Sequence, residues 1–273
     1  MADVRFCSAR DGIKLRYEIR GTGAPIVLVM GFSGSSRTWG EPFVQEIARR
    51  FQTVLIDNRG TGESDQPDQP WTIADMAADV AAVLDHARIA RAHLYGISMG
   101  GMIAQEFALN FPDRLDRLVL GCTNCGLHDA VLGAPEATGA LRPTPGITPA
   151  AQTRRLMEAC CSPAFAASPQ GQAFIEARIA AMANYPVTPM HTYKRQWAAI
   201  EGFGTLGRLA MIKAPTMVIT GSADSIVPAA NADLLQRHIP GAKAHVIEGA
   251  GHLFFWEAPE ESAEVPGDFL LRA

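Results

Sequence analysis

The sequence predicts an α/β fold in which a doubly wound, mostly parallel sheet is covered by helices on both faces. Short apolar runs alternate along the chain with longer segments whose apolar residues keep helical spacing, which is the pattern of such a fold. The apolar runs are continuous, as expected for parallel strands that are buried on both faces. The 273 residues, 48% of them hydrophobic, suffice for one large domain with a sizeable core.

The sheet is predicted to begin with a hairpin. Residues 4–7 and 13–19 alternate in character around Asp11-Gly12, a dipeptide that favours a tight turn between two strands. Six further strands complete a predicted eight-stranded sheet, and they are Ile26–Met30, Thr53–Asp57, Ala92–Ile97, Arg117–Gly121, Thr216–Thr220 and Ala244–Ile247.

Helical patterns stand between these strands. Apolar residues keep helical spacing over 72–88, and Thr72 with Asp75 three residues on predicts an N-cap. Near the end of the chain, Pro266-Gly267 lies inside the last helical pattern. Because proline inside a helix costs about 3 kcal/mol or more, we expect a kink or a break there.

The alternation stops between residues 122 and 210, where no convincing strand is found. Thr148-Pro149, Ser168-Pro169 and Thr188-Pro189 each place an N-cap residue before a proline, which predicts helices over about 149–161, 169–184 and 189–201. We therefore expect a helical cap over 122–210, inserted into a core formed by 1–121 and 211–273.

Composition excludes several function classes. The formal net charge of −4 predicts no attraction to nucleic acid or to an anionic membrane. The N-terminus lacks the pattern of a signal peptide, and no early apolar run is long enough to span a bilayer. We expect a cytoplasmic protein, monomeric or homodimeric, whose partner is a small molecule.

Five cysteines in a long chain argue against a disulfide framework. Cys122 and Cys125 form a C-x-x-C pair, but Cys160-Cys161 are adjacent and cannot supply the second pair of a zinc site. Buried thiols are therefore favoured over a redox or metal role, and no metal site is predicted.

Ser98 lies in Gly96-Ile97-Ser98-Met99-Gly100, between an apolar run and an alanine-rich amphipathic stretch. A glycine-x-serine-x-glycine segment in this setting is typical of a tight strand-to-helix turn that exposes a serine hydroxyl. The same pattern also occurs in ordinary loops. A catalytic role therefore depends on whether the sequence supplies a base and an acid.

His252 is the best candidate for the base, because it stands in a loop after the apolar run that ends at Ile247. Loops at the carboxyl ends of strands carry the sites of α/β folds. Asp224 follows the strand at 216–220 and is the best acid to orient the histidine, with Asp129 a weaker rival. A serine hydroxyl needs such a base, and the base needs an orienting group.

Acyl transfer also requires N–H donors that stabilise an oxyanion. Met99, directly after the serine, offers one backbone N–H. The loop after the strand at 26–30 offers the other, and Phe32 is the favoured residue in it. This loop has no P-loop lysine, which argues against phosphate binding.

These segments together resemble the α/β-hydrolase superfamily over nearly the whole chain. The residues that carry the resemblance are Gly96–Gly101, Asp57–Ser64, Gly221–Pro228 and Gly249–His252, with the order serine, acid, histidine. The serine turn and Gln105–Ala108 are similar to 3-oxoadipate enol-lactonases and related esterases. One departure is Met30-Gly31, where relatives usually carry His-Gly.

The resemblance implies an enzyme of the carboxylesterase or lactonase type (EC 3.1.1) that forms an acyl-enzyme on Ser98 and needs no cofactor or metal. Four alternatives remain open: a carbon–carbon bond hydrolase of ring-cleavage products, a cofactor-free perhydrolase or haloperoxidase, a small-ligand receptor that retains the triad, and a redox protein. The residues expected to line the substrate pocket are Trp39, Met182, Tyr185, Met190, Tyr193 and Trp197.

Overall fold

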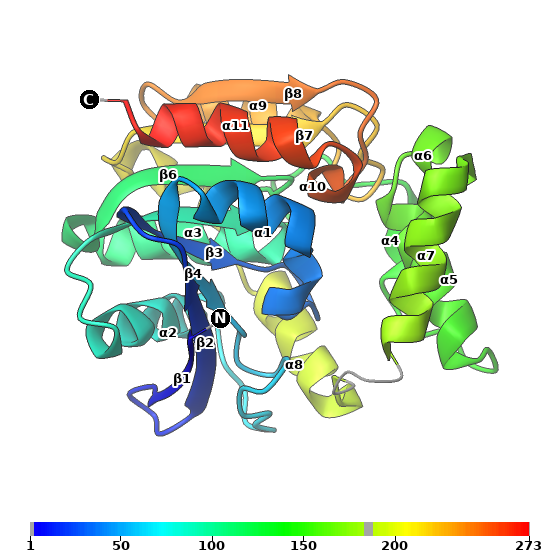
Figure 1. Cartoon of the computed structure of the whole chain (residues 1–273), viewed down its shortest axis with the longest axis horizontal. Coiled ribbons are helices and arrows are strands. Elements are labelled where there is room, and N and C mark those ends of the chain that lie inside the picture. The colour runs from blue at the N-terminus through cyan, green and yellow to red at the C-terminus, as the bar shows by residue number, and fades with distance from the viewer. Residues whose placement is uncertain (1–2, 183–187, 273) are drawn as a thin grey trace.

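A computed structural model describes residues 3–182 and 188–272 of the chain. One eight-stranded sheet forms its centre, in the order β1-β2-β4-β3-β5-β6-β7-β8 (Figure 1). β2 runs antiparallel to both of its neighbours, and all other pairs are parallel. The strands are β1 Asp3–Ser8, β2 Lys14–Arg20, β3 Ala24–Val29, β4 Phe51–Ile56, β5 Ala92–Ile97, β6 Leu115–Gly121, β7 Thr216–Gly221 and β8 Lys243–Ile247.

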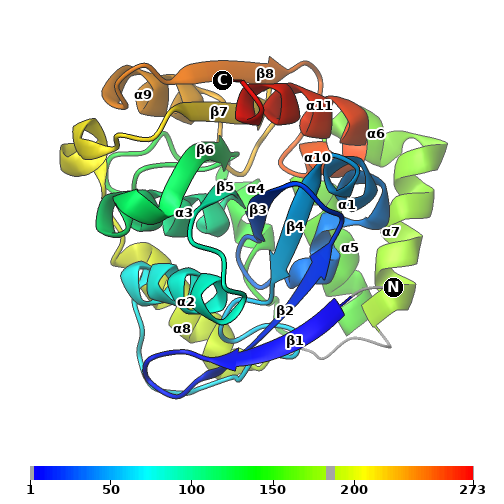
Figure 2. The same ribbon diagram turned by 60° about the vertical axis from the view of Figure 1, so that its left-hand side comes forward.

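Helices cover both faces of the sheet (Figures 1 and 2). α1 (Glu41–Ala48), α10 (Phe254–Glu257) and α11 (Pro259–Leu270) pack on one face around Phe43 and Phe254. The other face carries α2 (Ile73–His86), α3 (Met99–Asn110) and α9 (Ala230–His238). The predicted doubly wound, mostly parallel sheet is thereby confirmed.

The local predictions that rest on turn and cap chemistry are also confirmed. β1 and β2 pair as a hairpin, and Gly12 in the turn has a φ of 84°, which glycine adopts at no steric cost. Thr72 caps α2 by accepting from Asp75 N, while Asp75 accepts from Thr72 N in return. This reciprocal pair satisfies two N–H groups that would otherwise lack partners at the helix start.

Between β6 and β7 the described residues form helices joined by loops, and we call α4–α8 the cap helices. They are α4 Pro135–Ala140, α5 Pro149–Cys160, α6 Pro163–Ala167, α7 Pro169–Met182 and α8 Met190–Glu201. A short 3-10 helix, η3 (Leu206–Met211), precedes β7. Figure 1 shows α4–α7 grouped beyond the carboxyl ends of the parallel strands, whereas α8 lies apart from them.

Of the kink or break expected at Pro266, the break is absent, because α11 continues through this residue. Proline has no N–H to donate to the carbonyl four residues earlier, which is that of Ser262. The buried hydroxyl of Tyr95 donates to this same carbonyl at 3.3 Å. A tertiary hydrogen bond thus replaces the missing helical one, which the sequence of the helix alone does not reveal.

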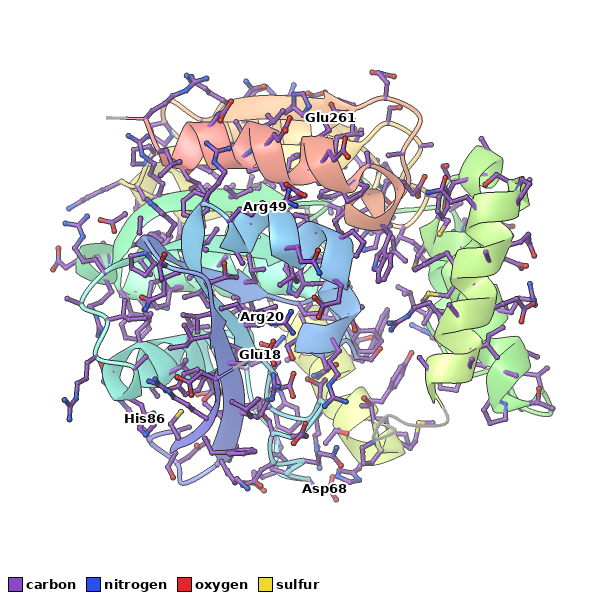
Figure 3. All side chains as sticks on the ribbon, viewed as in Figure 1. Glu18, Arg20, Arg49, Asp68, His86 and Glu261 are labelled. Atoms are coloured by element: carbon purple, nitrogen blue, oxygen red, sulfur yellow. The ribbon has the colours of Figure 1, made fainter. Side chains whose placement is uncertain are left out.

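Glu18 and Arg20 of β2 lie close together, with Glu18 buried and Arg20 partly exposed (Figure 3). Arg20 Nε donates to Glu18 Oε1 at 2.6 Å and Arg20 Nη1 to Glu41 at 2.7 Å. Among the described residues, no helix combines the length and the apolar character needed to cross a membrane.

Candidate active site

Ser98 occupies a strained turn between β5 and α3. Its φ of 52° and ψ of −123° are unusual for a residue with a side chain. The turn is tight enough that a Cβ on Gly96 would lie 2.1 Å from Gly100 O, and one on Gly100 would lie 2.1 Å from Val29 O. Glycine is therefore required at both positions, as expected for the tight turn that the sequence predicted.

The parallel register brings the four predicted strand ends to one edge. Ile97 of β5 lies beside Gly121 of β6, and Gly221 of β7 lies beside Ile247 of β8. The loops that follow these strands carry Ser98, Cys122, Asp224 and His252. Residues separated by more than 150 positions in sequence thus belong to one site.

His252 and Asp224 form a buried pair at this edge. His252 Nδ1 lies 2.7 Å from Asp224 Oδ2, and the two residues are 7% and 5% exposed. Asp224 Oδ1 accepts from the backbone N–H groups of Ile226 and Val227 at 2.9 and 2.8 Å. The carboxylate is therefore held by its own loop and fixes the orientation of the imidazole, the role expected of the third triad member.

The electrostatics of the pair favour a protonated imidazole. Burial acts to lower the pKa of His252, but the charge of the Asp224 carboxylate and the hydrogen bonds of the imidazole with Asp224 and Cys122 outweigh this and hold the pKa well above its ordinary value of 6.5. Burial also raises the pKa of the Cys122 thiol. The thiol is thus neutral near pH 7, and Asp224 supplies the negative charge beside His252.

Cys122 is a neighbour of the histidine that the sequence reasoning missed. Side-chain atoms of Cys122, Asp224 and His252 lie within 4.8 Å of one another, a set of atoms that zinc accepts as ligands. Both carboxylate oxygens of Asp224 are already bound, to His252 and to two backbone amides. We therefore interpret the three residues as a hydrogen-bonding cluster. Its position in the sequence could have indicated this contact, because Cys122 directly follows a strand that ends at the edge of the sheet where the site lies.

The positions of Cys122 and Cys125 argue against the redox alternative. Cys122 packs in the core on the α1 and α11 face of the sheet, whereas Cys125 packs on the α2 and α3 face. All five cysteines are buried and carry free thiols. The two thiols of the C-x-x-C pair therefore do not form a dithiol site.

The loop after β3 lies against the serine. A Cβ added to Gly31 would be 2.9 Å from Ser98 Cβ and 3.5 Å from Ser98 Oγ. Within the described part of the chain, the backbone N–H groups of Phe32 and Met99 have no hydrogen-bond acceptor. Both amides thus remain available for an oxyanion.

Ser98 Oγ makes no hydrogen bond to any residue that the structure describes. The serine–histidine bond that a triad requires is accordingly not formed in this structure. Such bonds are often long before substrate binds and shorten in the reactive complex.

The six expected pocket residues lie in different surroundings. Trp39 is 0% exposed and stacks on Phe43 with a centroid distance of 5.0 Å, so it belongs to the core and not to a pocket. Met190 is 50% exposed at the start of α8. Tyr193 and Trp197 pack on the ring of Phe32 at 4.6 and 5.6 Å. Tyr185 and the side chain of Met182 lie outside the described residues.

The rival acid Asp129 and a surface hollow among the described residues both lie apart from His252. Asp129 pairs with His128 at 3.2 Å, which leaves Asp224 as the acid that contacts His252. A surface hollow of about 390 Å³ is lined by residues of the β1–β2 turn and of 65–69, and none of the triad candidates lines it.

Comparison with known proteins identifies the family. Residues 24–259 match the model of the alpha/beta hydrolase fold. The chain belongs to this family, as the sequence motifs and the sheet order indicated.

Two relatives carry names that refer to different reactions. A RutD protein of Azorhizobium caulinodans, named for carbamate hydrolysis, is 32% identical over 253 residues, which cover 90% of this chain and 91% of the relative. A 2-hydroxy-6-oxononadienedioate/2-hydroxy-6-oxononatrienedioate hydrolase of Burkholderia vietnamiensis is 30% identical over 96% of this chain and 93% of its own.

Two solved structures are similar over almost their full length. Est816, described as an N-acyl homoserine lactone degrading enzyme, is 31% identical with a TM-score of 0.79 and covers 96% of this chain and 99% of its own. The enol-lactonase of Burkholderia xenovorans LB400 is 25% identical with a TM-score of 0.82, and the match covers 98% of this chain and 100% of the enol-lactonase chain.

Proposed function

We propose that this protein is a serine hydrolase that cleaves a small-molecule carboxylic ester or lactone through an acyl-enzyme on Ser98. The observation that carries the proposal is the buried 2.7 Å contact between His252 and Asp224 at the same sheet edge as the strained Ser98 turn. A nucleophile, a base and an orienting acid in this order are the parts that acyl transfer needs.

The reaction proceeds in two halves. Ser98 Oγ attacks the carbonyl carbon while neutral His252 takes the hydroxyl proton, and the amides of Phe32 and Met99 hold the developing oxyanion. His252 then gives the proton to the leaving alcohol oxygen, which departs and leaves the acyl group on Ser98. Water attacks this ester with His252 again as base, and the acid is released with Ser98 regenerated. Asp224 stabilises the imidazolium in both halves.

Relatives support an ester or lactone and also justify a second candidate. The lactone-degrading Est816 and the enol-lactonase favour a lactone carbonyl. The 30% identical dienedioate hydrolase favours carbon–carbon bond cleavage of a ring-fission product as the alternative. The two activities share the proposed triad, so substrate tests must separate them.

We expect Ser98→Ala to abolish turnover of the best substrate in a panel of aryl esters, aliphatic lactones and carbamates, with kcat reduced at least about 1,000-fold. Steady-state hydrolysis by the purified chain is the measurement. A ring-fission product, followed by loss of its absorbance, belongs in the same panel. Preference for it over every ester and lactone would favour the carbon–carbon hydrolase.

The matched control is Ser225→Ala, which removes a hydroxyl at the same edge that donates to Ala159 O. It should retain ester turnover within about threefold. Full activity in Ser98→Ala would overturn the mechanism. A single turnover with a persistent adduct would favour a ligand receptor instead.

A further inference from the structure

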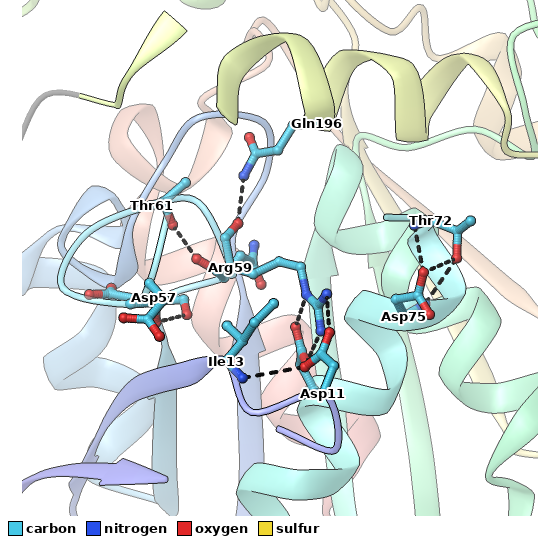
Figure 4. Close-up of polar contacts among 12 residues, drawn as sticks. Asp11, Ile13, Asp57, Arg59, Thr61, Thr72, Asp75 and Gln196 are labelled. Atoms are coloured by element: carbon cyan, nitrogen blue, oxygen red, sulfur yellow. Dashed lines mark hydrogen bonds and ion pairs between the residues drawn. The ribbon is translucent and has the colours of Figure 1, made fainter. Parts of the chain in front are cut away.

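The side chain of Gln196 on α8 joins two loops beside the candidate site. Gln196 Oε1 accepts from Ser33 N at 2.9 Å, and Gln196 Nε2 donates to Arg59 O at 3.1 Å. Figure 4 shows Gln196 reaching from its helix to the Arg59 carbonyl. The residue is 0% exposed, so its amide is fully committed to these two backbone groups. Buried polar side chains with both ends bound hold their partners rigidly.

The bond to Ser33 acts next to the expected oxyanion donor. Phe32 N–H shares its peptide plane with Gly31 C=O, and this carbonyl accepts from Gly34 N at 3.2 Å. The preceding plane is held by Asn58 Nδ2, which donates to Met30 O at 2.8 Å. The following plane contains Ser33 N–H, which Gln196 holds. The peptide that carries the donor is therefore fixed from both sides.

Ser33 needs external support, because its φ of 56° lies in the left-handed region that non-glycine residues seldom adopt. Both of its backbone groups are bound by the segment that contains α8, since Thr188 Oγ1 donates to Ser33 O at 3.4 Å. Without these bonds the turn that points Gly31 C=O at Gly34 N could relax. The orientation of the Phe32 N–H bond would then change.

Helix α8 presents three residues to this one loop. Tyr193, Gln196 and Trp197 are spaced i, i+3 and i+4, so they lie on one face of the helix. The two aromatic rings pack edge-on against Phe32 while Gln196 binds the next residue. A cap helix therefore contacts both the ring and the backbone of the expected oxyanion residue.

We infer that Gln196 is a positioning residue that holds the Phe32 amide of the oxyanion hole in place. Gln196 also links this loop to the backbone carbonyl of Arg59. The side chain of Arg59 is in turn held by Asp79 at 2.6 Å. The inference rests on the proposed hydrolase function. It implies that a cap residue outside the triad controls kcat, because an oxyanion donor acts most strongly in the transition state.

The test compares Gln196→Met, which keeps the volume but removes both hydrogen bonds, with Gln196→Glu, which keeps the acceptor for Ser33 N–H. We expect kcat of Gln196→Met to fall about tenfold to a hundredfold, with KM within about threefold, since losing a donor outright costs 10²–10³. Gln196→Glu should lose less. The inhibition constant of a trifluoromethyl ketone, which forms an oxyanion on the serine, should rise in proportion to the loss of kcat/KM.

Gln152→Met is the matched control, because Gln152 binds backbone groups in the same way elsewhere in the cap. Its Oε1 accepts from Thr144 N and its Nε2 donates to Ala140 O. Equal kcat losses in Gln152→Met and Gln196→Met would overturn the inference. The inference would also be overturned if kcat/KM of a folded Gln196 variant fell without a matching rise in the ketone inhibition constant. If Gln196→Met does not fold, Gln196→Glu is used for this test. Turnover by Ser98→Ala would instead overturn the proposed function itself.

Discussion

At the scale of single residues, the proposed mechanism depends on the protonation of His252. A general base must be neutral to accept the Ser98 proton. The charge of Asp224 holds the pKa of His252 well above 6.5, against the effect of burial. The rate should therefore rise with pH, and its half-maximum should lie above pH 6.5.

The variant Asp224→Asn tests whether the Asp224 carboxylate sets the pKa of His252. Removing the carboxylate takes away the charge that stabilises the imidazolium, so the acidic limb of the kcat/KM profile should move to lower pH. The maximal rate should fall by as much as about 10⁴-fold, because the amide also favours the wrong tautomer. Rates measured from pH 5 to 10 give both quantities.

Asp129→Asn is the control, since Asp129 contacts His128 and not His252. Its profile should match that of the unaltered chain. An acidic limb that stays in place in Asp224→Asn would show that another group sets the pKa of the base.

At the scale of elements, the loop after β4 is held by a buried ion pair. Arg59 donates through Nε and Nη2 to the two carboxylate oxygens of Asp79, both at 2.6 Å, and through Nη1 to Asp11 at 2.9 Å (Figure 4). Desolvation raises the pKa of Asp79 to about 6 although Arg59 opposes the shift. The pair thus has a large desolvation cost and mainly fixes the loop.

Asp79→Ala should lower the free energy of unfolding by about 3 kcal/mol, because it leaves the Arg59 guanidinium buried without its main partner. Urea denaturation measures the loss. Asp11→Ala removes the exposed partner and should cost less than about 1 kcal/mol. Similar losses in the two variants would contradict the assignment of Asp79 as the principal partner.

Elements also show where sequence reasoning is accurate. The hairpin at Asp11-Gly12 and the capped start of α2 depend on residues a few positions apart, so local sequence predicts them. Of the kink or break expected at Pro266, no break occurs, and Tyr95 of a distant strand donates to the carbonyl that the proline leaves without a helical donor. Local rules fail where a partner comes from elsewhere in the chain.

At the scale of the whole molecule, the five thiols report on the integrity of the core. All are buried, and burial raises their pKa values, to about 11 for Cys7 and about 12 for Cys160. Because the thiolate is the reactive form, buried neutral thiols react slowly. The folded chain should consume much less than one equivalent of a thiol-specific disulfide reagent in minutes.

In denaturant, all five thiols should react, since the chain contains five cysteines and no disulfide joins them. Absorbance of the released chromophore measures both reactions. Rapid stoichiometric reaction in the folded state would indicate an accessible, activated thiol and would restore the redox interpretation.

Local patterns were sufficient to predict the eight strands, the capped helix after Thr72 and the three candidate triad positions. Periodicity and turn chemistry are local, and the motif around Ser98 is contiguous, so these features can be read along the chain. Position after a strand was enough to select His252 and Asp224, because parallel strands end at one edge.

Contacts between distant side chains could be identified only from the folded chain. It placed Trp39 in the core rather than in a pocket, brought Cys122 to His252 and set Gln196 on Ser33 across 163 positions. Contacts between segments so far apart depend on how helices pack on the sheet, and no local pattern encodes that packing. The free energy of each such contact depends on two distant segments, whereas a sequence pattern describes only one segment.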